Sequence, residues 1–147
     1  MSTDQTVATH LIHTLENGKE GFEKAAVKLT DSNRPDVAAK FSEFANQRAT
    51  MSDELKQIAT AYGDDPEQRS TVPGALHRGW IAIKDALTGD DADAVIGAAE
   101  TGEDHAVAQY REALDEDISP EFRPVVVRQL AMVETAHNYV RSLLPTS

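Results

Sequence analysis

Long segments with helical periodicity, separated by only a few breaking residues, constrain the fold of this chain most strongly. The 147 residues include 8 glycines and 6 prolines, and these leave long uninterrupted stretches between them. Within each stretch, apolar residues recur three or four positions apart, which is the spacing of one face of an α-helix. The pattern predicts four long helices, at roughly 4–29, 35–62, 91–116 and 120–144, and a shorter one at roughly 73–87.

The apolar face of each long segment can be read from the sequence. Aromatic residues make up only 5% of the chain, and β-branched residues are scattered, so a sheet protein is not expected. We expect the inward stripes to consist of Val7, Leu11, Leu15, Phe22, Ala26 and Leu29; Val37, Phe41, Phe44, Ala45, Leu55, Ala59 and Tyr62; Val95, Ala99, Ala106, Tyr110 and Ala113; and Val126, Val133, Val140 and Leu144.

Breaking residues place the helix ends. Pro35 is suited to a first helical turn, and Gly63 suits the position just after a helix. The run Ser119-Pro120-Glu121 predicts the start of the last helix. Pro124 would then fall in its second turn, where it is expected to cost a hydrogen bond or to bend the helix.

The connections predict how the helices pack. Short turns join the first long helix to the second and the third to the fourth, so each pair should be antiparallel. At ~1.5 Å per residue, the segment 73–87 spans most of a bundle's length and is suited to a crossover. A bundle with one long crossover has the ferritin-like topology. The sequence therefore predicts a single all-α domain over residues 1–147, a ferritin-like four-helix bundle.

Charge and composition exclude several classes of protein. The 14 Lys and Arg against 25 Asp and Glu give a net charge of −11, which disfavours nucleic acid and anionic membranes as partners. The chain has no cysteine, so disulfides and thiolate metal sites are excluded. No apolar run approaches the length of a transmembrane helix, and Met1 to Thr9 lack a signal pattern. We expect a cytoplasmic protein.

Acidic residues and one histidine predict the level at which a core metal would bind. Di-metal bundles use one Glu from each of two helices and a Glu-x-x-His motif from each of the other two. Glu134 and His137 fit this motif. Residues at the same height on the other helices are Glu20, Glu43 or Gln47, and Glu100 or Glu103. However, Glu20 and Glu43 point away from their apolar stripes, and Asn46 stands where the second His would be.

A second interpretation of these residues needs no metal. Arg48, Gln129 and His137 fall within apolar stripes, and Glu103 lies beside one. A buried Arg requires a carboxylate, and Glu103 is nearest in height. The leading prediction is therefore a buried polar network of Arg48, Glu103, Gln129 and His137, with no cofactor. The alternative is iron or manganese held by Glu20, Glu103, Glu134 and His137.

The crossover segment carries a further candidate site. Trp80 is expected to anchor the core, with His77 and Arg78 beside it, and these three residues alternatively line a ligand pocket. Gly18 and Gly102 lie on apolar stripes. We expect each to allow the close approach of a bulky neighbour such as Trp80, because glycine within a helix costs ~1 kcal/mol.

The strings at residues 15–22, 47–49, 74–80, 100–104, 110–114, 129 and 136–137, taken together, resemble an uncharacterised bacterial ferritin-like family of four-helix bundles that is common in proteobacteria. The string Ala75-Leu76-His77-Arg78-Gly79-Trp80 is the most specific of them, and together the strings extend over nearly the whole chain in order. The resemblance implies a ferritin-like bundle. Some ferritin-like relatives store iron or activate oxygen, but Asn46 departs from their pattern.

These observations lead to three hypotheses about function. Phosphate-binding loops, dinucleotide fingerprints and nucleophile motifs are all missing from the sequence. The first hypothesis is a non-enzymatic interaction or stress-associated protein that forms a homo-oligomer, with a dimer favoured and any other protein partner unknown. The second is a metal-binding protein or di-metal oxidoreductase. The third is a carrier that binds a small ligand near Trp80.

Overall fold

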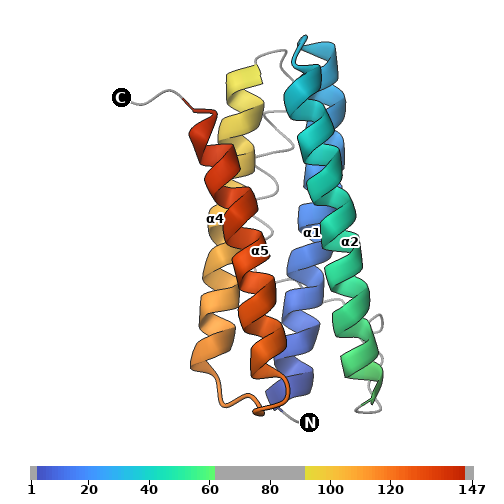
Figure 1. Cartoon of the computed structure of the whole chain (residues 1–147), viewed down its shortest axis with the longest axis vertical. Coiled ribbons are helices and arrows are strands. Elements are labelled where there is room, and N and C mark those ends of the chain that lie inside the picture. Colours follow the sequence, from blue (N-terminus) through green and yellow to red (C-terminus); the bar gives the residue numbers. More distant parts are fainter. Residues whose placement is uncertain (1–2, 62–91, 145–147) are drawn as a thin grey trace.

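The computed structural model describes residues 3–61 and 92–144, and these form four helices packed as a bundle (Figure 1). The helices are α1 (Thr3–Asp31), α2 (Pro35–Ala61), α4 (Ala92–Asp115) and α5 (Arg123–Ser142). The predicted all-α bundle is confirmed. The expected crossover at 73–87, with His77, Arg78 and Trp80, lies outside the described residues.

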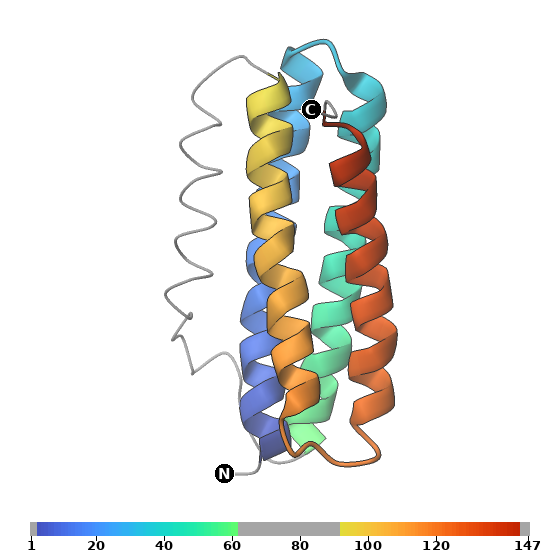
Figure 2. The same cartoon turned by 90° about the vertical axis from the view of Figure 1, so that its left-hand side faces the viewer.

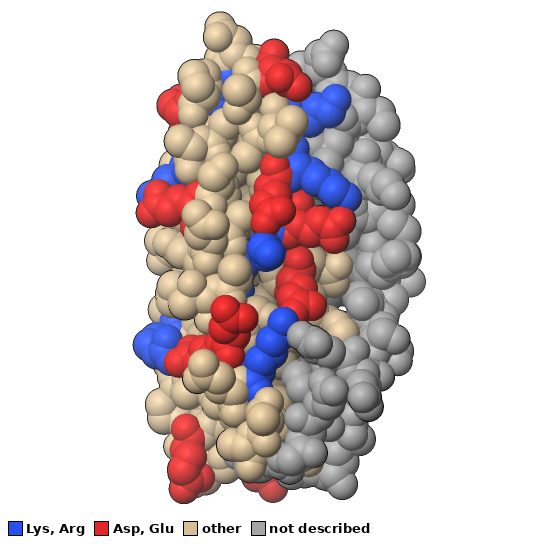
Figure 3. All heavy atoms as spheres, turned by 90° about the vertical axis from the view of Figure 1, so that its right-hand side faces the viewer, with Lys and Arg blue, Asp and Glu red and all other residues tan. Residues whose placement is uncertain are grey.

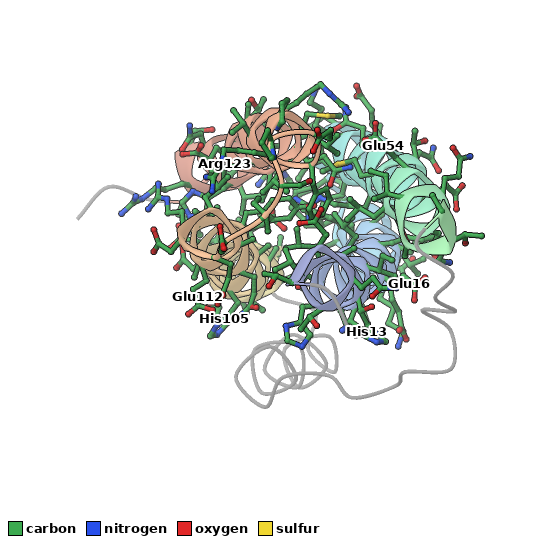
Figure 4. All side chains as sticks on the ribbon, turned by 90° about the horizontal axis from the view of Figure 1, so that it is seen from below. His13, Glu16, Glu54, His105, Glu112 and Arg123 are labelled. Atoms are coloured by element: carbon green, nitrogen blue, oxygen red, sulfur yellow. The ribbon has the colours of Figure 1, made fainter. Side chains whose placement is uncertain are left out.

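The helix directions follow the order of the chain. α1 runs up and α2 runs down in Figure 1, while α4 runs down and α5 runs up. Consequently α1 and α2 are antiparallel, α4 and α5 are antiparallel, and α2 is parallel to α4. Seen along the bundle axis, α2 and α4 occupy opposite corners, and α1 and α5 occupy the other two (Figure 4).

The turn between α1 and α2 shows how the sequence ends the first helix. Asn33 has a φ of 63°, a left-handed conformation that asparagine tolerates. The Arg34 amide donates to the Leu29 carbonyl at 2.8 Å, and the Asn33 amide donates to the Thr30 carbonyl at 3.2 Å. This pair of bonds forms a Schellman motif, which satisfies two carbonyls that the helix leaves free.

The start of α5 differs from the sequence expectation. The helix begins at Arg123 rather than at Pro120, so Pro124 lies in the first turn. A proline there removes no helical hydrogen bond, because the first amides have no intrahelical partner. The expected cost at Pro124 therefore does not arise. Ser119 is used in the preceding turn, where its hydroxyl accepts from the Phe122 amide at 3.1 Å.

The described residues of all four predicted apolar stripes face the core, and only Leu144 among them is partly rather than fully buried. They form two clusters, one above the other. The upper cluster contains Phe22, Phe41 and Phe44, whose rings pack edge-on or tilted against one another. The lower cluster contains Leu15 and Met51 among others. The level between the two clusters is where the candidate site lies.

Candidate functional site

The two apolar clusters are separated by one polar level in the middle of the bundle. On α2, Ala45 belongs to the upper cluster and Met51 to the lower, with Arg48 between them. On α4, Ala99 and Ala106 flank Glu103 in the same way. The bundle thus carries a charged pair at mid-height, enclosed above and below by apolar packing.

Arg48 and Glu103 form a two-pronged ion pair across the bundle. Nη1 donates to Oε1 at 2.9 Å and Nη2 donates to Oε2 at 2.5 Å. The side chains are 2% and 0% exposed. Because α2 and α4 stand at opposite corners, the pair joins helices that share no edge of the bundle (Figure 4). Parallel bonds between guanidinium and carboxylate fix geometry as well as charge.

The surroundings of Arg48 complete its burial. Its guanidinium carbon lies 5.2 Å from the centre of the Phe22 ring, which places the cation over an aromatic face. On the α1 side it meets Gly18, where a Cβ atom would lie 2.7 Å from Nη1. Among the described residues, the bulky neighbour of Gly18 is therefore Arg48, whereas Trp80, which the sequence expectation named, lies outside them.

A second polar group lies at the level of the lower cluster. The Tyr110 hydroxyl donates to Gln129 Oε1 at 2.7 Å, and Gln129 Nε2 donates to the Met51 carbonyl at 3.2 Å and to Glu54 Oε1 at 2.7 Å. Arg128 also pairs with Glu54. Burial raises the pKa of Tyr110 well above its ordinary value. The group links α4, α5 and α2 through hydrogen bonds, and Glu54 brings it to the surface.

His137 lies at the edge of the core, mostly buried, with its ring next to an exposed carboxylate. Its Nε2 is 2.5 Å from Asp104 Oδ1, and the two side chains are 13% and 61% exposed. On α5 the buried positions include Val133, Ala136 and Val140. His137 follows Ala136 by one residue, a turn of ~100°, and this rotation carries its ring to the edge that faces α4.

The four residues predicted to form one network are therefore not joined. Arg48 and Glu103 form one unit, Gln129 belongs to the Tyr110 group, and His137 pairs with Asp104. In residues 3–61 and 92–144, no hydrogen bond connects these three units. Tyr110 was expected to be an apolar stripe residue, and neither Glu54 nor Asp104 was expected to take part in a site. A buried tyrosine hydroxyl needs a partner, and that requirement was the available signal.

The alternative ligand set is likewise dispersed. Glu20 is 63% exposed and pairs with Lys24 at 2.7 Å. Glu134 is 41% exposed and pairs with Arg111 at 3.2 Å. Glu103 is bound to Arg48 in the core. No group of three or more His, Asp or Glu side chains with metal-binding placement occurs in the described part of the chain.

The sequence predicts no transmembrane helix, and the described helices test this prediction. Among the four described helices, none is both long enough and apolar enough to span a bilayer. The charged residues of α1 and α2 account for part of this. Figure 3 shows basic and acidic side chains interleaved over the face that these two helices present.

Comparison with known proteins identifies one family. No curated protein and no solved structure matched the chain. A family model described as a domain of unknown function, DUF2383, matches residues 7–116, which run from the first turns of α1 to just beyond the end of α4. The match covers more than half of the 147 residues and includes both partners of the central ion pair. The chain belongs to the DUF2383 family.

Proposed function

We propose that this protein is a non-enzymatic helical bundle that acts through protein–protein contacts, first of all with copies of itself. The observation that carries the proposal is the ion pair of Arg48 and Glu103. The guanidinium donates to both oxygens of the carboxylate at mid-height in the core. The charged groups of the core are thus engaged in holding the helices together, which leaves the surface for function.

The proposal includes a ferritin-like topology. Its support is the parallel course of α2 and α4, which places Ala61 and Ala92 at opposite ends of the bundle (Figure 1). Two parallel neighbours in sequence need a connection that returns along the bundle, and bundles with one such crossover are ferritin-like. Shared topology does not transfer the iron chemistry of other ferritin-like proteins, because function depends on the site.

The same ion pair bears on the metal hypothesis. A metal cation at Glu103 would have to bind next to the guanidinium of Arg48, which donates a hydrogen bond to each carboxylate oxygen and repels another positive charge. Glu134 pairs with Arg111, and His137 pairs with Asp104. Metal binding by the proposed set would require the central pair to separate and the remaining ligands to turn inward.

Two measurements on the full chain test the proposal. The first is elemental mass spectrometry on protein purified without chelator or affinity tag, and we expect iron and manganese well below one ion per chain. The second is sedimentation velocity over a range of concentrations, and we expect reversible association into dimers. Stoichiometric metal would contradict the non-enzymatic account, and a monomer at every concentration would contradict self-association.

A further inference from the structure

A chemically labile dipeptide, Asn17-Gly18, lies in the middle of α1, which runs the full height of the bundle (Figure 2). Asparagine is one of the thermolabile residues of proteins. Its weak point is the side-chain carbon Cγ, which the backbone nitrogen of the following residue can attack. Gly18 has no Cβ to hinder this attack, so the dipeptide combines a labile amide with an accessible nucleophile.

The reaction at this dipeptide needs only the chain and water. The Gly18 nitrogen forms a bond to Asn17 Cγ and loses its proton, and the side-chain nitrogen of Asn17 leaves as ammonia. The product is a cyclic succinimide. Water then opens the ring at one of its two carbonyl groups, so position 17 becomes either aspartate or isoaspartate.

The helix keeps the two reacting groups apart. Gly18 lies inside α1, where backbone amides donate to the carbonyl four residues earlier. Ring closure requires the Cα–C bond of Asn17 to rotate well away from the helical ψ of ~−42°. Asn17 Nδ2 also donates to the His13 carbonyl at 2.9 Å, which holds the side-chain amide against the preceding turn. The folded helix therefore blocks the reaction, whereas an unfolded chain permits it.

Contacts outside α1 fix the position of the residue that follows Asn17. Arg48 occupies the space beside Gly18, where a Cβ atom would lie 2.7 Å from Nη1. Both oxygens of Glu103 accept hydrogen bonds from that guanidinium, so it is held in place. On α1 itself, Leu15 belongs to the lower apolar cluster and Phe22 to the upper one. The backbone between these two residues must therefore keep its length.

The two possible products differ in their effect on this packing. Isoaspartate continues the chain through the former side-chain carbon, which adds one atom to the backbone at position 17. Leu15, Gly18 and Phe22 then cannot all keep their contacts, because a packed core does not absorb a change of register. Aspartate leaves the backbone unchanged and removes only the donor to the His13 carbonyl.

We infer that Asn17-Gly18 is a site of spontaneous covalent modification that the fold protects, and that its isoaspartate product prevents the core from packing again around Arg48. The reactant is water and the released product is ammonia. The site records the time that a chain spends unfolded, since only that state reacts. This modification is independent of the proposed self-association.

Reaction rates in the folded and unfolded chain test the protection. The full chain is kept at mildly alkaline pH in buffer or in denaturing guanidinium chloride, and the tryptic peptide that ends at Lys19 is followed by mass spectrometry. The rate at Asn17 should be about tenfold lower, or less, in buffer than in guanidinium chloride, because folded proteins open only rarely. Equal rates in the two solutions would overturn the protection.

The other three asparagines are controls within the same chain, because each is followed by a residue with a side chain. They are Asn33, Asn46 and Asn138. In guanidinium chloride they should react more slowly than Asn17. The Asn17→Gln variant should stay unmodified over the same period, since its longer side chain closes a ring less readily. An Asn17 that reacts no faster than the other three would overturn the assignment of the site.

The stability of the reacted chain tests the effect on the core. After guanidinium chloride is removed, isoaspartate is quantified with an isoaspartyl methyltransferase, and the reacted chains are separated by ion exchange. Chains with isoaspartate at position 17 should unfold at a lower urea concentration than unreacted chains. The Asn17→Asp variant, which reproduces the other product, should unfold near the midpoint of the unsubstituted chain. An unchanged midpoint for the isoaspartate chains would overturn the link to Arg48.

Discussion

Gly18 and Arg48 meet across the interface of α1 and α2, where a Cβ atom on Gly18 would lie 2.7 Å from Arg48 Nη1. That distance is shorter than any carbon–nitrogen contact allows. The end of an arginine side chain can usually move aside, but this one is 2% exposed and bound at both nitrogens by Glu103. Glycine at position 18 is therefore part of the site that accommodates the buried charge.

Gly18→Ala should destabilise the protein even though alanine is the better helix former. The gain in helix propensity, up to ~1 kcal/mol, is opposed by displacement of Arg48 from its carboxylate. Gly97→Ala is the matched control on α4, because a Cβ there meets nothing within 4 Å, and it should raise stability by ~0.5–1 kcal/mol. Urea unfolding of both variants measures the difference. Stabilisation by both substitutions would show that Arg48 moves aside freely.

Removing one partner of the ion pair should be far more harmful than removing both. Glu103→Leu or Arg48→Met alone leaves an uncompensated buried charge, which costs ~3–5 kcal/mol. The double variant replaces the pair by apolar groups and should lie within ~1 kcal/mol of the unsubstituted chain or above it. A double-mutant cycle from urea denaturation gives the coupling energy. Additive losses in the double variant would contradict the pair as described.

His137 provides the comparison for a pair with one exposed partner. His137→Phe removes only the contact with the 61% exposed Asp104, and exposed pairs contribute ~0.2–1 kcal/mol. The variant should therefore lose much less stability than Glu103→Leu in the same urea titration. Equal losses in these two variants would mean that His137 has a larger structural role than its contacts indicate.

Tyr110 should make stability sensitive to alkaline pH. Burial holds its pKa in the folded state above the unfolded value near 10, so the folded state keeps its proton longer. The stabilisation is complete below pH ~10 and is lost at ~1.4 kcal/mol per pH unit as the unfolded chain ionises.

The Tyr110→Phe variant tests this linkage. It should cost ~1–3 kcal/mol at neutral pH, because Gln129 Oε1 loses its donor, and its stability should fall less steeply above pH ~10. Tyr139→Phe is the comparison. Burial raises the pKa of Tyr139 as well, but this residue is only partly buried, so its effect on the slope should be smaller. Chemical denaturation at a series of alkaline pH values measures both slopes. Identical slopes for the two variants would show that Tyr110 does not carry the effect.

Periodicity was sufficient to predict the four described helices and their inward faces, because apolar burial dominates helix packing. The residue at which a helix begins depends on the hydrogen bonds of the turn before it. At α5, the turn residues before Arg123 form hydrogen bonds with Ser119, and the sequence pattern alone placed the start at Pro120. The pairing of Arg48 with Glu103 was predictable because a buried guanidinium needs a carboxylate at the same height.

The remaining polar contacts depend on rotation about each helix axis. Gln129 and His137 both fall on the predicted inward stripe, yet Gln129 is buried and His137 lies at the edge beside Asp104. Eight residues along α5 leave the two side chains ~80° apart around the helix axis, and a stripe that covers a wide arc does not resolve this difference. The contact between Gly18 and Arg48 was also not predictable, because it depends on the register of two helices.

We propose that the polar level inside the bundle is structural, and melting in the presence of metal tests this role most directly. A tight site would stabilise the folded chain by ~2.7 kcal/mol at a metal concentration one hundred times the dissociation constant, which raises the melting temperature by several degrees. With ferrous iron under anaerobic conditions, or with manganese, we expect a shift of no more than ~1 °C. A rise of several degrees that disappears in Glu134→Ala and His137→Ala would contradict the account.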